Sequence, residues 1–271
     1  MKNKKIKIGI IGGGVMGESC MRQLIAGGCV EPRNVMVSNP NATRLRVLKK
    51  QYGVGTSTRN ADVLERSEVI ILAVKPQSAR EVCTSIKETV GDQLFISIMA
   101  GVSVDFLQKQ LGTKKVVRSM PNTPAQIGQG MVVWYAPRVI QKAERALVEE
   151  IFSVLGKTLQ VHSEDVIDKA TAVSGSGPAY LFYFAECLID AAQALGLGYK
   201  DATLLVRETL AGSSLLLKHS GKNPKILRER VTSKGGTTAA AFEVVEPSAM
   251  HVVWEKALKA ACQRARQLRL E

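Results

Sequence analysis

The 271-residue chain has little of what metal centres and nucleic-acid-binding domains are built from. Its three histidines are far apart and its five cysteines form no C-x-x-C pair, so neither residue type predicts a metal site. Aromatic residues make up 5% of the chain, and the basic residues behind its net charge of +13 are dispersed. Without a nucleic-acid-binding motif, this charge favours attraction of anionic small molecules. We therefore expect no metal and no nucleic-acid partner.

Long apolar runs are also missing. None approaches the roughly 20 residues of a membrane-spanning helix, so we expect no membrane interaction. The basic first five residues pass straight into an apolar strand, without the apolar region and cleavage site of a signal peptide. A cytoplasmic location is expected, and scattered, unpaired cysteines agree with it because thiols there stay reduced. The length favours two domains of about 150 residues each.

What the chain does have is a glycine-rich stretch near its start. An isoleucine-rich strand over residues 6–11 precedes Gly12, Gly14 and Gly17, spaced G-x-G-x-x-G, and a helical pattern follows. In a dinucleotide site the first glycine makes the turn, the second lets a pyrophosphate approach, and the third lets helix and strand pack. The helix N-terminus adds N–H groups and a positive dipole end. The alternative is a glycine-rich turn of another α/β protein, and the strand–turn–helix context favours the dinucleotide site.

The segment after the second expected strand indicates which dinucleotide binds. NAD sites place an acidic residue there to hold the ribose 2′-hydroxyl, yet residues 32–61 contain no acidic residue. They offer Ser38, Asn39, Arg44 and Arg46, whose groups can bind a 2′-phosphate. For Arg46 a place on the exposed helix surface is the preferred interpretation. We expect NADP(H) to be preferred, with NAD(H) possible.

Further strands alternate with helices up to about residue 162. We expect strands over residues 69–74, 94–98, 115–117, 131–135 and 158–161. Residues 120–124 contain two prolines and are expected to form a rigid loop without regular structure. Ligands of such sheets lie outside the carboxyl ends of the strands. Residues 12–17, 38, 75–76, 99–101 and 120–124 fall at those ends.

From about residue 163 strand signals stop and helical patterns follow. Residues 181–195 and 204–217 are apolar on most helix faces, which predicts burial, here against a partner subunit. Two stretches interrupt the helices. Residues 174–180 are expected to be a flexible joint whose Pro178 opens a helix. Residues 233–238 combine glycines and threonines at a helix start, which suits a carboxylate. The alternative for both is a capped turn between helices.

Together these motifs resemble pyrroline-5-carboxylate reductases. The resemblance rests on residues 12–17, 73–76 (Ala-Val-Lys-Pro), 120–124, 174–180 (Ser-Gly-Ser-Gly-Pro-Ala-Tyr) and 231–238, in family order and spacing. It implies an N-terminal α/β Rossmann-type dinucleotide-binding domain over residues 1–162. It also implies an all-α helical substrate and dimerisation domain over residues 163–271. The implied activity is reduction of 1-pyrroline-5-carboxylate to L-proline by hydride transfer from NAD(P)H, in a dimer or a ring of dimers.

The resemblance also implies site residues. Those expected at the cofactor are Gly12, Gly13, Gly14, Val15, Met16, Gly17, Ser38, Asn39, Asn60, Ala73, Val74, Lys75, Pro76, Ile98, Met99, Ala100 and Glu164. Those expected at the substrate carboxylate and ring nitrogen are Ser233, Gly235, Gly236, Thr237 and Thr238. One departure is visible, because Lys234 stands where the family usually has proline, which puts the shape of the loop in question.

The chemistry needs a donor to the imine nitrogen, and the hydroxyl of Thr238 is the catalytic candidate. Threonine is a weak acid, so water or an already protonated iminium remains open as the proton source. Lys75 is a second candidate donor, although a helix-start cation is the preferred interpretation. One rival function is that of a β-hydroxyacid dehydrogenase, but the lysine expected after its glycine-rich signature is absent up to Lys200. The other rival is a non-enzymatic NADP(H)-binding sensor.

Overall fold

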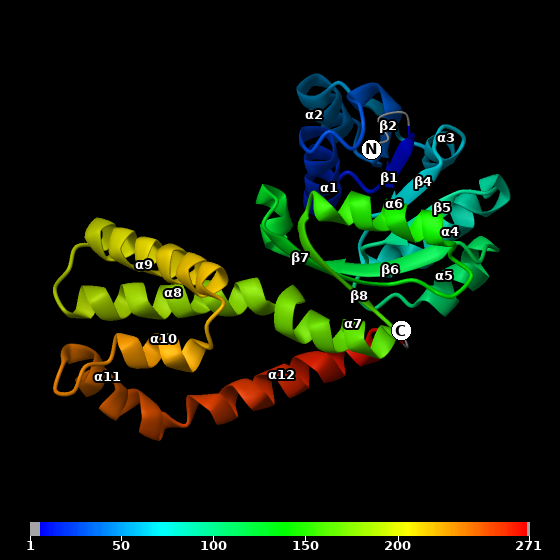
Figure 1. Cartoon of the computed structure of the whole chain (residues 1–271). Helices are drawn as coiled ribbons and strands as arrows, with labels where there is room; N and C mark the ends of the chain where they lie inside the picture. Colours follow the sequence, from blue (N-terminus) through cyan, green and yellow to red (C-terminus); the bar gives the residue numbers. More distant parts are fainter. Residues whose placement is uncertain (1–5, 270–271) are drawn as a thin grey trace. The chain divides into compact units, whose positions relative to one another are not determined.

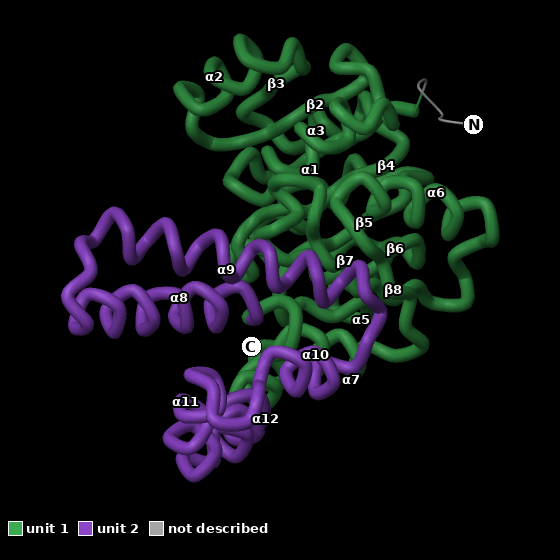
Figure 2. Tube along the Cα trace, turned by 60° about the vertical axis from the view of Figure 1, so that its left-hand side comes forward, with its two compact units in different colours: residues 1–176, 261–271 green, residues 177–260 purple. Residues whose placement is uncertain are grey.

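The computed structural model describes residues 6–269, which form two compact units (Figure 2). Among the described residues, unit 1 comprises residues 6–176 and 261–269, and unit 2 comprises Gly177–Ala260. The boundary expected at residue 162 lies inside unit 1, and residues 261–269 also belong to unit 1. The basic residues 1–5, which entered the signal-peptide argument, lie outside the described residues.

Unit 1 is built on an eight-stranded sheet with the order β3-β2-β1-β4-β5-β6-β7-β8 (Figure 1). The first six strands in this order are parallel, and β7 runs antiparallel to β6 and parallel to β8. The order 3-2-1-4-5-6 is that of a Rossmann fold, which confirms the predicted fold class. The strands are β1 (Ile8–Ile11), β2 (Val35–Ser38), β3 (Gly55–Ser57), β4 (Val69–Leu72), β5 (Leu94–Ser97), β6 (Val116–Pro121), β7 (Gly130–Tyr135) and β8 (Gly156–Val161).

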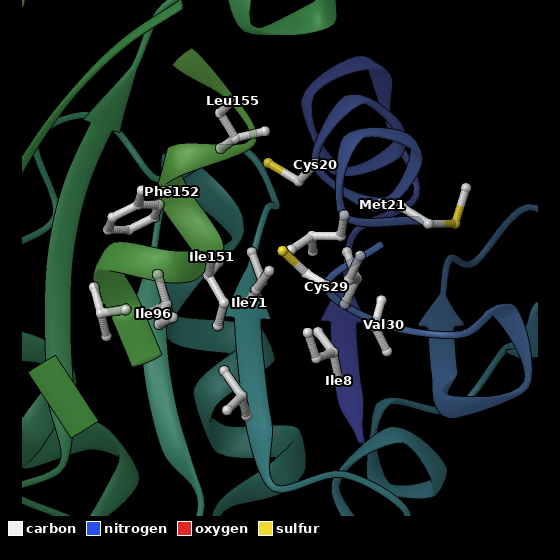
Figure 3. Close-up of a cluster of buried hydrophobic side chains, with 14 of the residues drawn as sticks. Ile8, Cys20, Met21, Cys29, Val30, Ile71, Ile96, Ile151, Phe152 and Leu155 are labelled. Carbon is white, nitrogen blue, oxygen red and sulfur yellow. The ribbon is translucent and has the colours of Figure 1, made fainter. Parts of the chain in front are cut away.

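Helices cover both faces of this sheet, because its central strands are apolar on both sides. One core contains side chains of α1 (Val15–Ala26), α2 (Ala42–Tyr52) and α6 (Lys142–Ser153). Figure 3 shows part of this core, where Ile8 and Ile71 of the strands face Cys20 of α1 and Ile151 of α6. The other core contains side chains of α3 (Asn60–Leu64), α4 (Ala79–Ile86) and α5 (Val104–Leu111). Because β1 to β6 are parallel, their carboxyl ends lie along one edge of the sheet.

The segment over residues 120–124 was expected to lack regular structure, and this prediction is wrong. Strand β6 continues through Pro121, which pairs in register with Val132 of β7. Proline is tolerated there because the pairing of β6 with β5 runs from Val116 to Arg118, so Pro121 lies beyond it, where β6 is an edge on that side. The 3-10 helix η4 (Thr123–Ile127) follows, with Pro124 in its first turn, where a missing N–H costs nothing. Shorter 3-10 turns are η1 (Pro32–Asn34), η2 (Pro76–Ser78) and η3 (Lys87–Thr89).

The stretch expected to be a flexible joint, residues 174–180, contains the boundary between the two units, between Ser176 and Gly177, and is helical on both sides of it. After α7 (Glu164–Ala170) the backbone continues as a π-helical turn, η5 (Thr171–Gly175). The Ser176 N–H bonds the Thr171 carbonyl at 2.8 Å, and the Asn122 amide donates to the Ser174 carbonyl at 3.0 Å. Helix α8 (Gly177–Ala194) then begins with Pro178 in its first turn, as predicted. Asn122 therefore holds the last turn of unit 1 before the boundary.

Unit 2 is helical, as the sequence predicts. Helices α8 and α9 (Tyr199–Ser220) pack against each other, and α10 (Pro224–Arg230), α11 (Thr237–Val245), the turn η6 (Glu246–Ser248) and α12 (Met250–Gln267) follow. From Ala261 onward α12 belongs to unit 1. Many apolar side chains of α8 and α9 are exposed, among them Phe182 and Leu204. No helix in the described part of the chain is long and apolar enough to cross a membrane.

Candidate active site

The three glycines of the motif have three different surroundings at the edge where the parallel strands end. Gly12 has a φ of +108°, and a Cβ there would lie 2.6 Å from the carbonyl oxygen of Ala73. A Cβ on Gly17 would lie 1.9 Å from the carbonyl oxygen of Gly12, so helix and turn pack too closely for a side chain. A Cβ on Gly14 would meet nothing within 4 Å. The residues therefore fit a dinucleotide turn, with its open side at Gly14, where a pyrophosphate approaches the backbone.

Strand β2 anchors this turn. The carbonyl of Ser38 accepts hydrogen bonds from the N–H groups of Gly12, at 3.0 Å, and Gly13, at 3.1 Å. Ser38 is fully buried, and its hydroxyl donates to the Asn60 amide oxygen at 2.8 Å. The Asn39 side chain accepts from the N–H of Asn41 at 2.9 Å. The fold thus brings Ser38 and Asn60 together beneath the turn, while Asn39 lies at the partly exposed strand end.

Arg44 is held by the glycine turn and by α1. Its Nε donates to the Gly13 carbonyl at 2.9 Å, and its guanidinium pairs with the carboxylate of Glu18. The Tyr52 hydroxyl donates to the same carboxylate at 2.8 Å. Burial raises the pKa of Glu18, but the bonds from Arg44 and Tyr52 outweigh it, so this pKa lies below its ordinary value. Arg46 is exposed and donates to the Thr43 hydroxyl at 3.0 Å, in line with a helix-surface role.

The ends of β4 and β5 lie beside the turn. The Ala73 N–H bonds the Ile11 carbonyl at 2.8 Å, and the Ile98 N–H bonds the Leu72 carbonyl at 3.1 Å. Val74 is half-buried, Lys75 is exposed, and Pro76 starts η2. Ala100 is half-buried, but the side chain of Met99 belongs to the core. Met99 can therefore reach a ligand at this edge only through its backbone.

Glu164, expected at the cofactor, has its carboxylate occupied by protein groups. Oxygen Oε1 accepts from the Val104 N–H and from the Arg118 guanidinium, each at 3.0 Å. Arg118 also donates to Asp168 at 2.7 Å, and Asp168 pairs with Arg269 at 2.8 Å. Arg118, Asp168 and Arg269 were not among the predicted site residues. Two local signals marked Arg118 and Asp168: an arginine inside an apolar strand, and carboxylates four residues apart on one helix.

The expected substrate loop lies in unit 2, between α10 and α11. Gly235 has a φ of +73°, and the Gly236 N–H bonds the Ser233 carbonyl at 3.0 Å. Helix α11 starts at an N-cap glycine, Gly236, so no N-cap side chain accepts from the N–H groups of its first turn. Within the described residues, the hydroxyls of Thr237 and Thr238 make no hydrogen bond. They stand at the start of α11 beside its N–H groups, while Lys234 is exposed.

Relatives of this chain match it nearly from end to end. A pyrroline-5-carboxylate reductase from Synechocystis is 38% identical over 263 residues, covering 97% of this chain and 98% of that protein. The chain belongs to the pyrroline-5-carboxylate reductase family. An Arabidopsis thaliana member is 32% identical over 266 residues, covering 98% of this chain and 96% of that protein. The resemblance stated from the sequence motifs is thereby confirmed.

Domain-level and structural matches agree with the pyrroline-5-carboxylate reductase family. The model for pyrroline-5-carboxylate reductase dimerisation matches residues 164–268, and a model described as NADP oxidoreductase, coenzyme F420-dependent, matches residues 7–101. The solved structure of a pyrroline-5-carboxylate reductase from Coxiella burnetii has a TM-score of 0.90 and 36% identity, covering 97% of this chain and 98% of that one. A Plasmodium falciparum pyrroline carboxylate reductase with NADP bound has a TM-score of 0.88 and 29% identity, covering 98% and 99%.

Proposed function

We propose that the strand ends of unit 1 bind NADP(H) and that residues 233–238 of unit 2 bind the substrate. The activity is that of the family, reduction of the C=N bond of 1-pyrroline-5-carboxylate to L-proline, the last step of proline biosynthesis. The observation that carries the residue-level proposal is the uncapped start of α11, with two threonine hydroxyls that make no hydrogen bond among the described residues. This segment offers donors to an anion and to a ring nitrogen.

The loop residues have separate roles in this proposal. The N–H groups at the start of α11 and the Ser233 and Thr237 hydroxyls bind the substrate carboxylate. The Thr238 hydroxyl donates a hydrogen bond to the ring nitrogen. This nitrogen receives the electron pair of the C=N bond when hydride adds to the imine carbon. NADP(H), when bound, supplies the hydride, and much of the rate comes from holding the two reactants in one orientation. Lys75 remains a cation at the start of η2.

The glycine turn and the end of β2 select the dinucleotide. Gly14 leaves the backbone open to a pyrophosphate, and the N–H groups of Val15, Met16 and Gly17 have no acceptor within the helix. Asn39 follows β2 directly and Arg44 lies in the first turn of α2, and residues 32–61 contain no carboxylate side chain, which favours a 2′-phosphate. The relative from P. falciparum binds NADP. We therefore propose NADP(H) as the preferred cofactor, with NAD(H) accepted more weakly.

Self-association follows from the dimerisation region matched over residues 164–268. Exposed apolar side chains gather on the two long helices of unit 2, and patches of this kind mark protein interfaces. They include Leu181, Phe182, Tyr183, Phe184, Leu188, Leu204, Leu205, Leu215, Leu216 and Leu217. We propose that these faces are covered in a dimer and that dimers assemble further into a ring. A cytoplasmic location and the absence of a nucleic-acid partner belong to the same proposal.

One assay tests the activity against both rivals. NADPH absorbance is followed in three reactions: its loss with NADPH and 1-pyrroline-5-carboxylate, its gain with NADP and 3-hydroxyacids, and its loss with NADPH alone. We expect a rate only with the cyclic imine. A rate only with hydroxyacids would establish a β-hydroxyacid dehydrogenase. NADPH binding without turnover of either substrate would establish a non-enzymatic sensor.

A further inference from the structure

A neutral cluster of two arginines and two carboxylates lies inside unit 1. Arg118 of β6 is 1% exposed and Asp168 of α7 is fully buried, and they are joined at 2.7 Å. Arg118 also pairs with Glu164 at 3.0 Å, and Asp168 with Arg269 at 2.8 Å. Because an unpaired buried charge is costly, each member depends on its partner. The four residues come from three separate parts of the sequence.

One arm of the cluster holds the loop between β5 and α5. Glu164 accepts the N–H of Val104, the first residue of α5, at 3.0 Å. The other end of this loop is fixed where the Ser97 hydroxyl accepts the N–H of Met99 at 3.3 Å. Residues 99–103 are thus fixed at one end by Ser97 of β5 and at the other end by Glu164 of the cluster. The proposed cofactor residues Met99 and Ala100 lie in this loop.

The other arm brings the end of the chain to the same loop. Beyond α12, Leu268 packs on Gly101 so closely that a Cβ there would lie 2.6 Å from the Leu268 Cβ. Arg269, next in the chain, is the residue that pairs with Asp168. A cavity of about 270 Å³ lies beside this contact, and its lining includes Pro76, Arg80, Gly101, Leu268 and Arg269. Leu268 and Arg269 therefore form part of the lining of a cavity beside the segments that follow β4 and β5.

We propose that Arg118 and Arg269 are positioning residues for the cofactor loop. Acting through Glu164 and Asp168, they hold residues 99–104 in one conformation, so that loss of the Arg269 contact loosens the loop and weakens cofactor binding. The role assigned to Glu164 changes with this, since its carboxylate fixes α5 and Arg118. The proposal rests on the proposed cofactor site but is independent of which substrate is reduced.

The test compares two ion pairs that join the end of the chain to α7. Arg269→Gln removes the contact with buried Asp168, and Arg269→Lys keeps a charge there. Arg266→Gln is the matched control, because Arg266 pairs at 2.7 Å with Asp165, which is only partly buried. Hydrogen exchange at residues 101–104 and NADPH affinity by fluorescence titration are measured on the full-length protein.

In Arg269→Gln we expect faster exchange at residues 101–104 and roughly tenfold weaker NADPH binding, the scale on which networks couple sites. Arg269→Lys should recover most of the affinity, and Arg266→Gln should match the wild type. Unchanged exchange and affinity in Arg269→Gln would overturn the proposal. An equal loss of exchange protection and NADPH affinity in Arg266→Gln would also overturn it. The effect would then come from any ion pair between α7 and residues 266–269, and not from the buried cluster. Both readouts remain informative if the imine assay fails, so the two failures are distinguishable.

Discussion

Glu18 on α1 and Arg44 on α2 form an ion pair directly above the glycine turn, and Arg44 also bonds the Gly13 carbonyl at 2.9 Å. The arginine expected to meet a 2′-phosphate is therefore shared with a carboxylate. This pair ties the first two helices to the turn and reduces the positive charge offered to a cofactor at the β2 end. If Arg44 meets the 2′-phosphate as proposed, we expect Glu18 to influence the preference between NADPH and NADH.

Replacing Glu18 by glutamine should increase the preference for NADPH. The neutral amide leaves the Arg44 charge uncompensated towards a 2′-phosphate. We expect the ratio of the NADH and NADPH dissociation constants to rise about threefold, about the contribution of a partly exposed ion pair. Fluorescence titrations at fixed ionic strength measure this ratio. Arg44→Gln should lower it, and unchanged ratios in both variants would place the phosphate elsewhere.

The same pair should make stability depend on acid pH. The folded-state pKa of Glu18 is lowered from its ordinary value of 4.5. The unfolded chain therefore takes up the proton at higher pH than the folded protein. The stabilisation is complete above pH 4.5 and is lost as pH falls through the folded pKa. Urea unfolding of wild type and Glu18→Gln should differ at pH 7 and converge in acid. A difference that does not change with pH would contradict this assignment.

The glycine turn predicts opposite behaviour for two alanine substitutions. Gly17→Ala forces a Cβ against the Gly12 carbonyl and should destabilise unit 1 by about 1–3 kcal/mol, as overpacking does. Gly14→Ala has free space, so it should fold normally but weaken NADPH binding at least about tenfold, because the methyl occupies the pyrophosphate approach. Gly198→Ala is the control, since Gly198 also precedes a helix in open space. Thermal unfolding and titration separate the two effects, and NADPH affinity unaltered by Gly14→Ala would argue against this site.

Thr238→Ala should lower kcat by about 10²-fold, the loss typical of one donor to developing charge. The dissociation constant of NADPH should not change, and Thr238→Ser should restore most of the rate. Thr232→Ala is the control. Thr232 follows α10, and its hydroxyl donates to the Arg228 carbonyl in the last turn of that helix at 2.8 Å. Steady-state kinetics with the cyclic imine give the comparison. Normal turnover in Thr238→Ala would remove this hydroxyl from the mechanism.

A charge on α9 should disrupt self-association. Leu204 is 59% exposed in the single chain, and Leu204→Glu would bury a carboxylate if this face is covered in a dimer. Light scattering at micromolar concentration should then show a smaller particle than the wild type. Gln51→Glu adds the same charge on the exposed surface of α2 and should leave the size unchanged. A wild-type monomer, or a Leu204→Glu variant of unaltered size, would contradict the proposed interface.

Several elements could be predicted from the sequence because their signals are local. The apolar runs of β4 and β5 required strands buried on both faces, and Pro178 marked the start of α8. Strand β3 was not predicted, because Gly55–Ser57 has no apolar pattern. It is a strand at the edge of the sheet, formed by its pairing with β2. The reversed direction of β7 was also not predictable, since strand direction depends on pairing partners. At residues 171–175 the helix persists as a π turn, against the local preference of serine and glycine.

The sequence by itself determined the dinucleotide turn, the two-part architecture and the family, because glycine spacing and hydrophobic periodicity are properties of neighbouring residues. Only the tertiary structure decided what the charged groups do. Arg44 lies against Glu18, and Glu164 is held by Arg118, whose second partner Asp168 reaches Arg269 at the end of the chain. These pairs join residues far apart in the sequence, and burial, which strengthens such contacts, exists only once the sheet and its helices have packed.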